Sequence, residues 1–151
     1  MAGLELNVPD DYLKQLIDTS FEEIADQALK EAAPTLQESI VKSIKASMQP
    51  HGDSELLKSI RTSKPKATKT DAYIVNVYPS GNARQTYYYA HGKKIYKYTV
   101  SNALKAIWLE YGNREGRQPP RPWLAHAVND STAEVMRIIQ KVWEAKTGQK
   151  L

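Results

Sequence analysis

The strongest constraint on the fold is an apolar segment that ends at a glycine and is followed by a proline-rich approach to a second helix. Residues 106–112 have the sequence Ala-Ile-Trp-Leu-Glu-Tyr-Gly, and residues 120–127 have the sequence Pro-Arg-Pro-Trp-Leu-Ala-His-Ala. Glycine tolerates the positive φ with which many helices end, and proline suits the start of a helix but not its interior. No apolar side chain with helical spacing lies between the two segments. We therefore expect two helices joined by an exposed loop over residues 113–120.

Helical periodicity is present on both sides of this loop. Ser101 can cap a short helix that Gly112 ends in a left-handed conformation. The apolar face of this short helix is expected at Leu104, Ile107, Trp108 and Tyr111. A longer helix should extend to residue 147, with its apolar stripe at Leu124, Val128, Val135, Ile139 and Val142. Within this longer helix, Asn129-Asp130 and a capping box over residues 131–134 predict a break or kink.

The N-terminal segment, residues 1–60, is predicted to be helical. A first helix is expected after Pro9-Asp10, with its apolar stripe at Leu13, Ile17, Phe21, Ile24 and Ala28. Pro34 should interrupt it, because proline lacks the backbone donor and clashes with the preceding turn. Thr35 and Glu38 then form a capping box for a second helix. The apolar side chains of this second helix are Leu36, Ile40, Ile44 and Met48. A short third turn is expected over residues 54–60.

The segment 71–100 has the pattern of a small sheet. Residues 73–78 form a β-rich run that Pro79 ends, and two more strands are expected at residues 86–90 and 94–100, joined across His91-Gly92. In the last strand, side-chain alternation predicts one face of Tyr96, Tyr98 and Val100, and we expect Lys94, Lys97 and Thr99 to be solvated. Residues 61–70 are expected to be a loop or the exposed start of a strand.

These elements predict a single domain over residues 1–151. It comprises a helical segment (residues 1–60), the sheet (residues 71–100) and C-terminal helices (residues 101–147). The predicted class is α+β, a small antiparallel sheet of three or four strands packed against N-terminal and C-terminal helices. A chain of 151 residues can bury enough surface to fold without metals or disulfides, and this chain has no cysteine. We expect a soluble, unexported protein, because no apolar run is long enough to span a membrane.

Charge is distributed unevenly along the chain. The net charge is +4, yet residues 1–40 hold nine acidic and two basic side chains. The remaining residues therefore hold eight acidic and nineteen basic ones. A chain with an acidic end and a basic body can associate head to tail with copies of itself. Ordinary solvated faces explain the same asymmetry, so charge alone does not decide between the two interpretations.

The sequence contains no recognisable catalytic or metal-binding motif. His51, His91 and His126 have no spacing that places two of them on one helical face. No phosphate-binding loop or nucleophile elbow is present. We therefore expect no catalytic residue, no metal and no cofactor. Glu110 is the one acid in an apolar segment that could act as a general base, and an ion pair with a loop arginine is the simpler role. The arginines in question are Arg114, Arg117 and Arg121.

Tyrosines and cations alternate in the predicted sheet. The tyrosines are Tyr87, Tyr88, Tyr89, Tyr96 and Tyr98, and the nearby cations are Arg84, Lys93, Lys94 and Lys97. Aromatic rings can stack on bases while cations neutralise phosphates, which makes a small basic nucleic-acid-binding protein the alternative function. We favour tyrosines that pack beneath the helices or against a neighbouring subunit, because the glycine-aromatic spacing of an RNA-recognition motif is missing.

The prolines on either side of Arg121 hold the approach to Trp123 extended. Trp108, Trp123 and Trp143 all lie near helical apolar stripes, so packing in the core is the default expectation for each of them. A rigid approach can also present Arg121 and Trp123 to a partner as a fixed knob. Arginine and tryptophan are enriched among the residues that contribute most to protein interfaces.

The combination of the Leu-Glu-Tyr-Gly segment with Pro-Arg-Pro-Trp-Leu resembles the signature of the neck or tail-completion proteins of long-tailed phages, also described as head–tail joining or minor tail proteins. The resemblance covers residues 101–128. Many of these proteins also carry a Gly-x-Leu-x-x-Ser-Ile element before their sheet, to which residues 52–60 are loosely similar. The matching residues are Glu110, Tyr111, Gly112, Pro120, Pro122, Trp123 and Ala127. The resemblance implies that these residues fix the turn between the short helix and the C-terminal helix. Asn113 departs from the pattern, in which a small residue commonly follows the glycine.

What the resemblance implies about function is a non-enzymatic structural subunit of the virion, made in the host cytoplasm and located at the head–tail junction. Its partners would be its own copies in a ring, with six expected from tail symmetry, the head connector or head-closure proteins and the tail terminator. Non-specific contact with DNA in the channel is compatible with this role, and a membrane partner is not expected. The candidate subunit interface comprises Glu22, Glu23, Asp26, Arg114, Arg117, Arg121 and Trp123.

Overall fold

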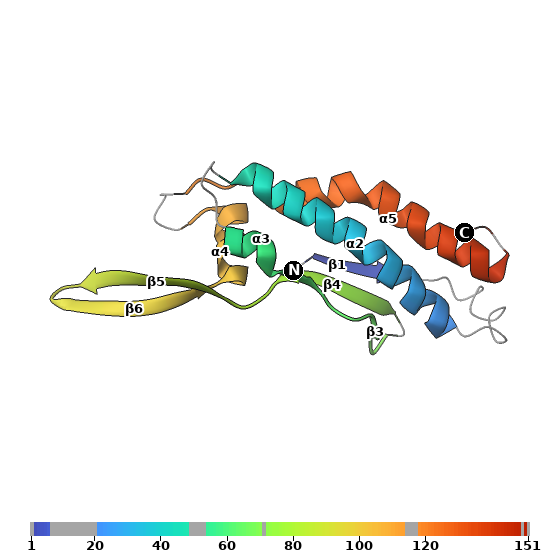
Figure 1. Cartoon of the computed structure of the whole chain (residues 1–151), viewed down its shortest axis with the longest axis horizontal. Coiled ribbons are helices and arrows are strands. Elements are labelled where there is room, and N and C mark those ends of the chain that lie inside the picture. The colour runs from blue at the N-terminus through green and yellow to red at the C-terminus, as the bar shows by residue number, and fades with distance from the viewer. Residues whose placement is uncertain are drawn as a thin grey trace.

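The structure of the chain is a computed structural model that describes residues 2–6, 21–48, 54–70, 72–113, 118–148 and 150. The elements in these ranges are β1 (Ala2–Leu6), α2 (Phe21–Ser47), α3 (Ser54–Ser59), β2 (Ile60–Thr62), β3 (Lys66–Ala67), β4 (Tyr73–Pro79), β5 (Asn82–His91), β6 (Lys94–Ser101), α4 (Asn102–Tyr111) and α5 (Trp123–Thr147). Long helices cover a small antiparallel sheet (Figure 1), which confirms the α+β class.

The main sheet is four-stranded and has β4 at its centre. β1 and β2 pair antiparallel with β4 on either side, and the short β3 pairs with β4 as well. Val75 and Val77 alternate with half-buried residues along β4 and are both fully buried. This period of two is what a strand with one face on the core requires. The third turn over residues 54–60 is also confirmed, as α3 followed directly by β2.

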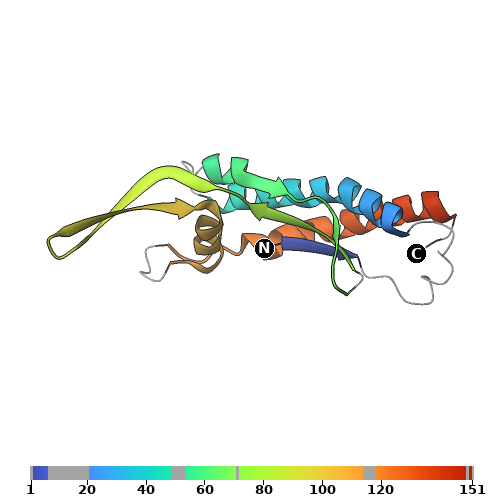
Figure 2. The same cartoon turned by 90° about the horizontal axis from the view of Figure 1, so that it is seen from below.

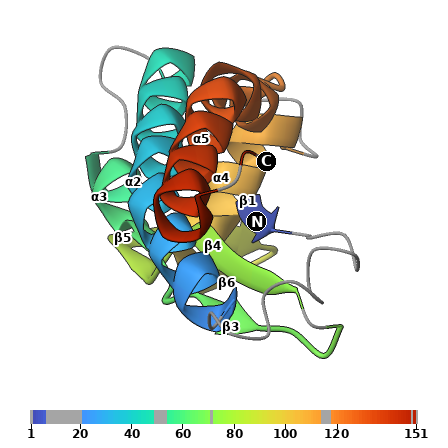
Figure 3. The ribbon, with the colours of Figure 1, turned by 90° about the vertical axis from the view of Figure 1, so that its right-hand side faces the viewer.

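α2 and α5 lie side by side on one face of this sheet (Figure 3). Two serine hydroxyls of α2 donate across the contact to backbone oxygens of α5, Ser39 to Ala127 at 2.8 Å and Ser43 to Trp123 at 2.6 Å. The pairing order shows that the two helices run antiparallel. α2 also buries several small residues, Ala25, Ala28, Ala32 and Ala33.

The prediction that Pro34 divides two helices is wrong. α2 is continuous from Phe21 to Ser47 with Pro34 in its interior, so Thr35 and Glu38 form no capping box there. The apolar positions continue in phase through the proline, and their burial offsets the lost backbone bond. These buried positions are Leu29, Ala33, Leu36, Ile40 and Ile44. The predicted helix start between residues 10 and 20 lies outside the described residues.

α5 is also continuous, so the predicted break at Asn129-Asp130 is wrong. Ser131 does not begin a new helix, because its hydroxyl donates to Ala127 O at 2.8 Å within the same helix. The buried stripe is Trp123, Ala127, Ser131, Val135, Ile139, Val142 and Trp143. Val128, which the periodicity places in the stripe, is 42% exposed. Gly148 ends the helix in a left-handed conformation, and its N–H bonds Glu144 O at 2.8 Å.

β1 adds a strand to the N-terminal segment, in which the sequence predicts helices only after Pro9-Asp10. Its register on β4 runs from Ala2 opposite Val77 to Leu6 opposite Tyr73. Five residues are too few for a helical period to appear, and the pairing with β4 determines their conformation. Likewise β2 and β3 lie within the segment expected to be a loop or the start of a strand.

β5 and β6 form a separate two-stranded sheet, which we call the hairpin arm (residues 82–101). The strands pair antiparallel with Tyr87 opposite Tyr98 and Tyr89 opposite Tyr96. The hairpin arm extends past the helices at one end of the molecule (Figures 1 and 2). The prediction places alternate tyrosines of the sheet beneath the helices and the others at a sheet edge or against a neighbouring subunit. Tyr96 and Tyr98 are 42% and 41% exposed, so these two do not pack beneath the helices. The side chains of residues 83–91 lie outside the description.

Candidate functional site

Gly112 ends α4 in a backbone conformation that favours glycine. Its φ is +76°, as predicted, but its ψ of 175° is extended rather than left-handed helical. This combination is populated almost only by glycine. A Cβ at this position would lie 2.7 Å from Gln118 O and 3.2 Å from Pro120 Cδ. The absence of a side chain therefore lets the returning loop close against the end of α4.

The loop is held closed by Asn113. Its backbone N–H donates to Gln118 O at 3.2 Å, and its Oδ1 accepts from Gln118 N at 3.3 Å. An asparagine can make both bonds at once, which gives a structural role to the residue that departs from the family pattern. Arg114 and Arg117 lie outside the described residues, so the structure does not place these two candidate interface residues.

Glu110 connects the two helices directly. Its Oε2 accepts from the backbone N–H of Leu124 at 2.9 Å, in the first turn of α5. The N-cap residue Pro122 has no side-chain cap of its own, so the Glu110 carboxylate takes that place. A carboxylate is favoured there because the first turn of a helix has unpaired N–H groups and a partial positive charge. The expected ion pair with Arg121 is not formed.

Arg121 and Trp123 face inward, so the default expectation of core packing is confirmed for Trp123, and the alternative of a fixed knob for a partner does not fit. Arg121 Nη1 donates to Ser47 O at 2.6 Å, at the C-terminal end of α2, and its backbone N–H donates to Leu109 O at 2.8 Å. Trp123 is 7% exposed, and its Nε1 donates to Ala106 O at 3.0 Å. Both side chains therefore tie the loop to the helices of the same chain.

We call this arrangement the α4–α5 joint. It comprises Glu110, Gly112, Pro120, Arg121, Pro122, Trp123 and Ala127, which join α4, α5 and the end of α2. Ala127 is fully buried, and its carbonyl accepts from Ser39 of α2. Tyr111, the one matching residue outside the joint, is 71% exposed.

Of the four residues that the sequence predicted to form the buried face of α4, three are exposed and Trp108 is half-buried. Leu104, Ile107 and Tyr111 are 39%, 51% and 71% exposed, and we call them the α4 apolar face. The side of α4 that packs inward is formed by Asn102, Ala106 and Leu109. α4 has only a narrow contact with the core, so the broader apolar stripe lies on the outside. Ser101 caps the helix as predicted and accepts from Leu104 N at 3.1 Å.

Sequence reasoning missed Asn102, which fixes the base of the hairpin arm. Its backbone N–H donates to Gly81 O at 3.0 Å, and its Nδ2 donates to Ser80 O at 2.8 Å. The side chain is 5% exposed. An asparagine directly after a helix-capping serine was the available signal, because asparagine at an element boundary often bonds backbone groups.

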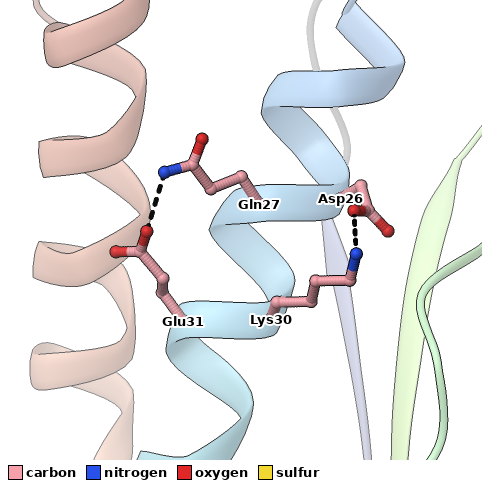
Figure 4. Close-up of polar contacts among 4 residues, drawn as sticks. All are labelled: Asp26, Gln27, Lys30 and Glu31. Atoms are coloured by element: carbon pink, nitrogen blue, oxygen red, sulfur yellow. Dashed lines mark hydrogen bonds and ion pairs between the residues drawn. The ribbon is translucent and has the colours of Figure 1, made fainter.

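The acidic residues of the candidate interface lie on the outer side of α2. Glu22 and Glu23 are exposed, while Asp26 is half-buried and paired with Lys30. One residue further along, Gln27 Nε2 donates to Glu31 Oε1 at 2.8 Å, and Figure 4 shows the two pairs on different sides of the helix. Glu22 and Glu23 lie on the polar face of α2, as predicted.

One surface pair on α5 perturbs a carboxyl group. Arg137 donates to both carboxylate oxygens of Glu134, at 2.8 and 2.6 Å. These hydrogen bonds, reinforced by the positive charge, lower the pKa of Glu134. Exposed pairs of this kind contribute little to stability.

Other features of the described surface suggest no chemistry. Within residues 2–6, 21–48, 54–70, 72–113, 118–148 and 150, no cluster of three acids or histidines could hold a metal ion. A shallow, open groove of about 500 Å³ lies along α2 between Pro34 and Lys45, lined by residues of that helix alone. No helix in the described ranges combines the length and apolarity needed to cross a membrane.

The fold and the site together define an α+β domain whose motif residues form a structural joint and whose largest projection is a basic hairpin. Comparisons with models of protein families, with curated proteins and with solved structures found no match to this chain. Function is therefore inferred from the motif residues and from the geometry of the chain itself.

Proposed function

We propose that the protein is a non-enzymatic structural subunit of a phage head–tail junction, acting in a ring that joins the head connector to the tail. The motif that resembles neck and tail-completion proteins supports this proposal. The similarity extends over residues 101–128, and most of the matching residues lie in the α4–α5 joint.

The observation that carries the proposal is the role of Glu110. It is the acid that sequence reasoning considered as a general base, and its carboxylate caps α5 through Leu124 N. Trp123 and Arg121 likewise bond backbone oxygens of the same chain. A motif whose polar side chains bond the protein's own backbone is typical of a scaffold element rather than of a reacting centre.

The test is to delete the gene for this protein from the phage genome that carries it and to examine the lysate by electron microscopy. We expect DNA-filled heads and separate tails, with joined particles restored when the protein is supplied in trans. A normal yield of joined, infectious particles without the protein would refute the proposal. Purified particles should also contain the protein in a ring at the neck.

One observation favours the second candidate, a nucleic-acid-binding protein. The hairpin arm exposes Lys94, Lys97, Tyr96 and Tyr98 away from the body. Scattered cations of this kind give weak, salt-sensitive and sequence-independent binding, which a neck protein beside a DNA channel can also show. Titration with duplex and single-stranded DNA at physiological salt distinguishes the neck protein from the nucleic-acid-binding protein. Submicromolar affinity lost on replacing Tyr96 and Tyr98 would favour the second candidate.

A further inference from the structure

The hairpin arm is a long projection with little support from the rest of the chain. Within the described residues it joins the body at its base, where Val100 is buried and Asn102 bonds Ser80 and Gly81. Residues 94–99 are all exposed, and Ile95 is exposed by 74%. A two-stranded hairpin is marginally stable in water unless another surface packs on it.

The charge of the hairpin arm has one sign. Residues 82–101 contain four cations, Arg84, Lys93, Lys94 and Lys97, and no acid. The first portion of α2, residues 21–38, has the opposite balance, with five acids and one base. We call residues 21–38 the acidic half of α2. The remainder of that helix, residues 39–47, carries only the bases Lys42 and Lys45.

These two complementary surfaces lie at opposite ends of the molecule. Figures 1 and 2 show the hairpin arm extending from one end and the start of α2 at the other. A contact between them therefore has to join two copies of the chain. Because the contact joins unlike surfaces, it is heterologous, and such contacts close into a ring when the rotation between copies allows it.

We propose that the hairpin arm of one copy docks on the acidic half of α2 in the next copy. Lys97 would face exposed carboxylates such as Glu22 and Glu23, and Ile95, on the same face of β6, would be removed from water. Lys94, near the tip of the hairpin arm, adds to its positive charge. This inference rests on the proposed function, since it supplies the contact between copies that a ring requires. It assigns a surface to each side of that contact.

A second copy is favoured over nucleic acid as the occupant for two reasons. Ile95 is an aliphatic side chain, which gains from burial against protein but offers neither stacking nor phosphate binding. The matching acidic surface is present on the same chain, so the partner is always available at the assembly site. Binding of nucleic acid by the hairpin arm is a separate outcome that the experiments below distinguish.

Cross-linking tests the contact directly, because the chain has no cysteine of its own. Thr99→Cys places a thiol on the hairpin arm without removing a cation. Lys30→Cys places one in the acidic half without removing an acid, and Lys45→Cys is the matched control on the same helix. All three positions are exposed. Mixed at high protein concentration with a short bismaleimide, Thr99→Cys should cross-link to Lys30→Cys about tenfold more than to Lys45→Cys.

Charge reversal tests whether electrostatic attraction causes the docking of the hairpin arm on α2. Reversal of the hairpin arm (Lys94→Glu with Lys97→Glu) or of the helix (Glu22→Lys with Glu23→Lys) should each reduce the cross-link about tenfold. A chain with both reversals should recover it, and the control Lys42→Glu with Lys45→Glu should not change it. Circular dichroism would verify that each variant is folded.

The outcomes separate this inference from the proposed function. Equal cross-linking of Lys30→Cys and Lys45→Cys, or self-association unaffected by reversal of the hairpin arm, would overturn the docking model while leaving a ring by other surfaces. Loss of DNA binding on reversal, with self-association unchanged, would assign the hairpin arm to nucleic acid instead. Failure of the gene deletion to block joining would overturn the proposed function, whatever the cross-links show.

Discussion

Glu110 Oε2 accepts a hydrogen bond from the backbone N–H of Leu124 at 2.9 Å, so a side chain from the last turn of α4 caps the first turn of α5. The two helices are separated in sequence by a loop, and this bond ties the start of α5 to the end of α4. A cap supplied from another helix couples the stability of α4 to that of α5.

Replacement of Glu110 by alanine should destabilise the protein by about 1 kcal/mol, the usual cost of removing a helix cap. Glu110→Gln should lose less, because the amide oxygen can still accept the bond. Urea unfolding of both variants measures the free energies. Glu38→Ala, at an exposed position on α2, is the control and should change little. Equal stability of Glu110→Ala and wild type would show that the cap is unimportant.

Gly112→Ala should cost about 2 kcal/mol or more, because the new Cβ meets Gln118 O at 2.7 Å in addition to the strain of positive φ. Gly112→Val should cost more. Gly148→Ala separates the two causes, because Gly148 also has positive φ but has no atom within 4 Å of its Cβ position. Its cost should be about 1 kcal/mol. Similar losses in both variants, measured by thermal unfolding, would show that the close approach contributes nothing.

The two buried tryptophans should respond differently to phenylalanine. Trp123 donates from Nε1 to Ala106 O, so Trp123→Phe leaves a buried carbonyl short of a partner and should cost about 1–3 kcal/mol. Trp143 Nε1 is buried with no hydrogen-bond partner among the described residues. Trp143→Phe therefore removes an unsatisfied donor, and it should cost less than Trp123→Phe by about 1 kcal/mol or more. Equal losses in chemical denaturation would contradict this distinction.

Sequence reasoning located most elements because periodicity and chain-breaking residues determine them locally. The strands at residues 73–79 and 94–101 and the cap at Ser101 follow from alternation and from side-chain chemistry. The two wrongly predicted helix breaks have a common physical cause. Pro34 and Asn129-Asp130 are unfavourable in an isolated helix, but the packing of α2 on α5 and on the sheet outweighs that local penalty.

The candidate site was less predictable than the fold. The motif located the residues of the α4–α5 joint, but their roles depend on contacts between distant segments, such as Arg121 with Ser47 and Trp123 with Ala106. Which face of α4 is buried depends on how much of that helix touches the core, which a helical period does not specify. The exposure of Ile95 has the same origin, because strand alternation does not say whether another layer covers the strand.

The last prediction tests which face of α4 is buried, using neighbouring aliphatic residues of similar size. Leu109 is 5% exposed and belongs to the core, so Leu109→Ala should cost about 2–4 kcal/mol through lost burial and a cavity. Ile107 is 51% exposed, so Ile107→Ala should change the free energy of unfolding by about 0.5 kcal/mol or less. Urea unfolding of the two variants at low protein concentration decides between the faces. Comparable losses would mean that the α4 apolar face is buried in the folded monomer, as helical periodicity alone suggests, and that it is not an exposed surface.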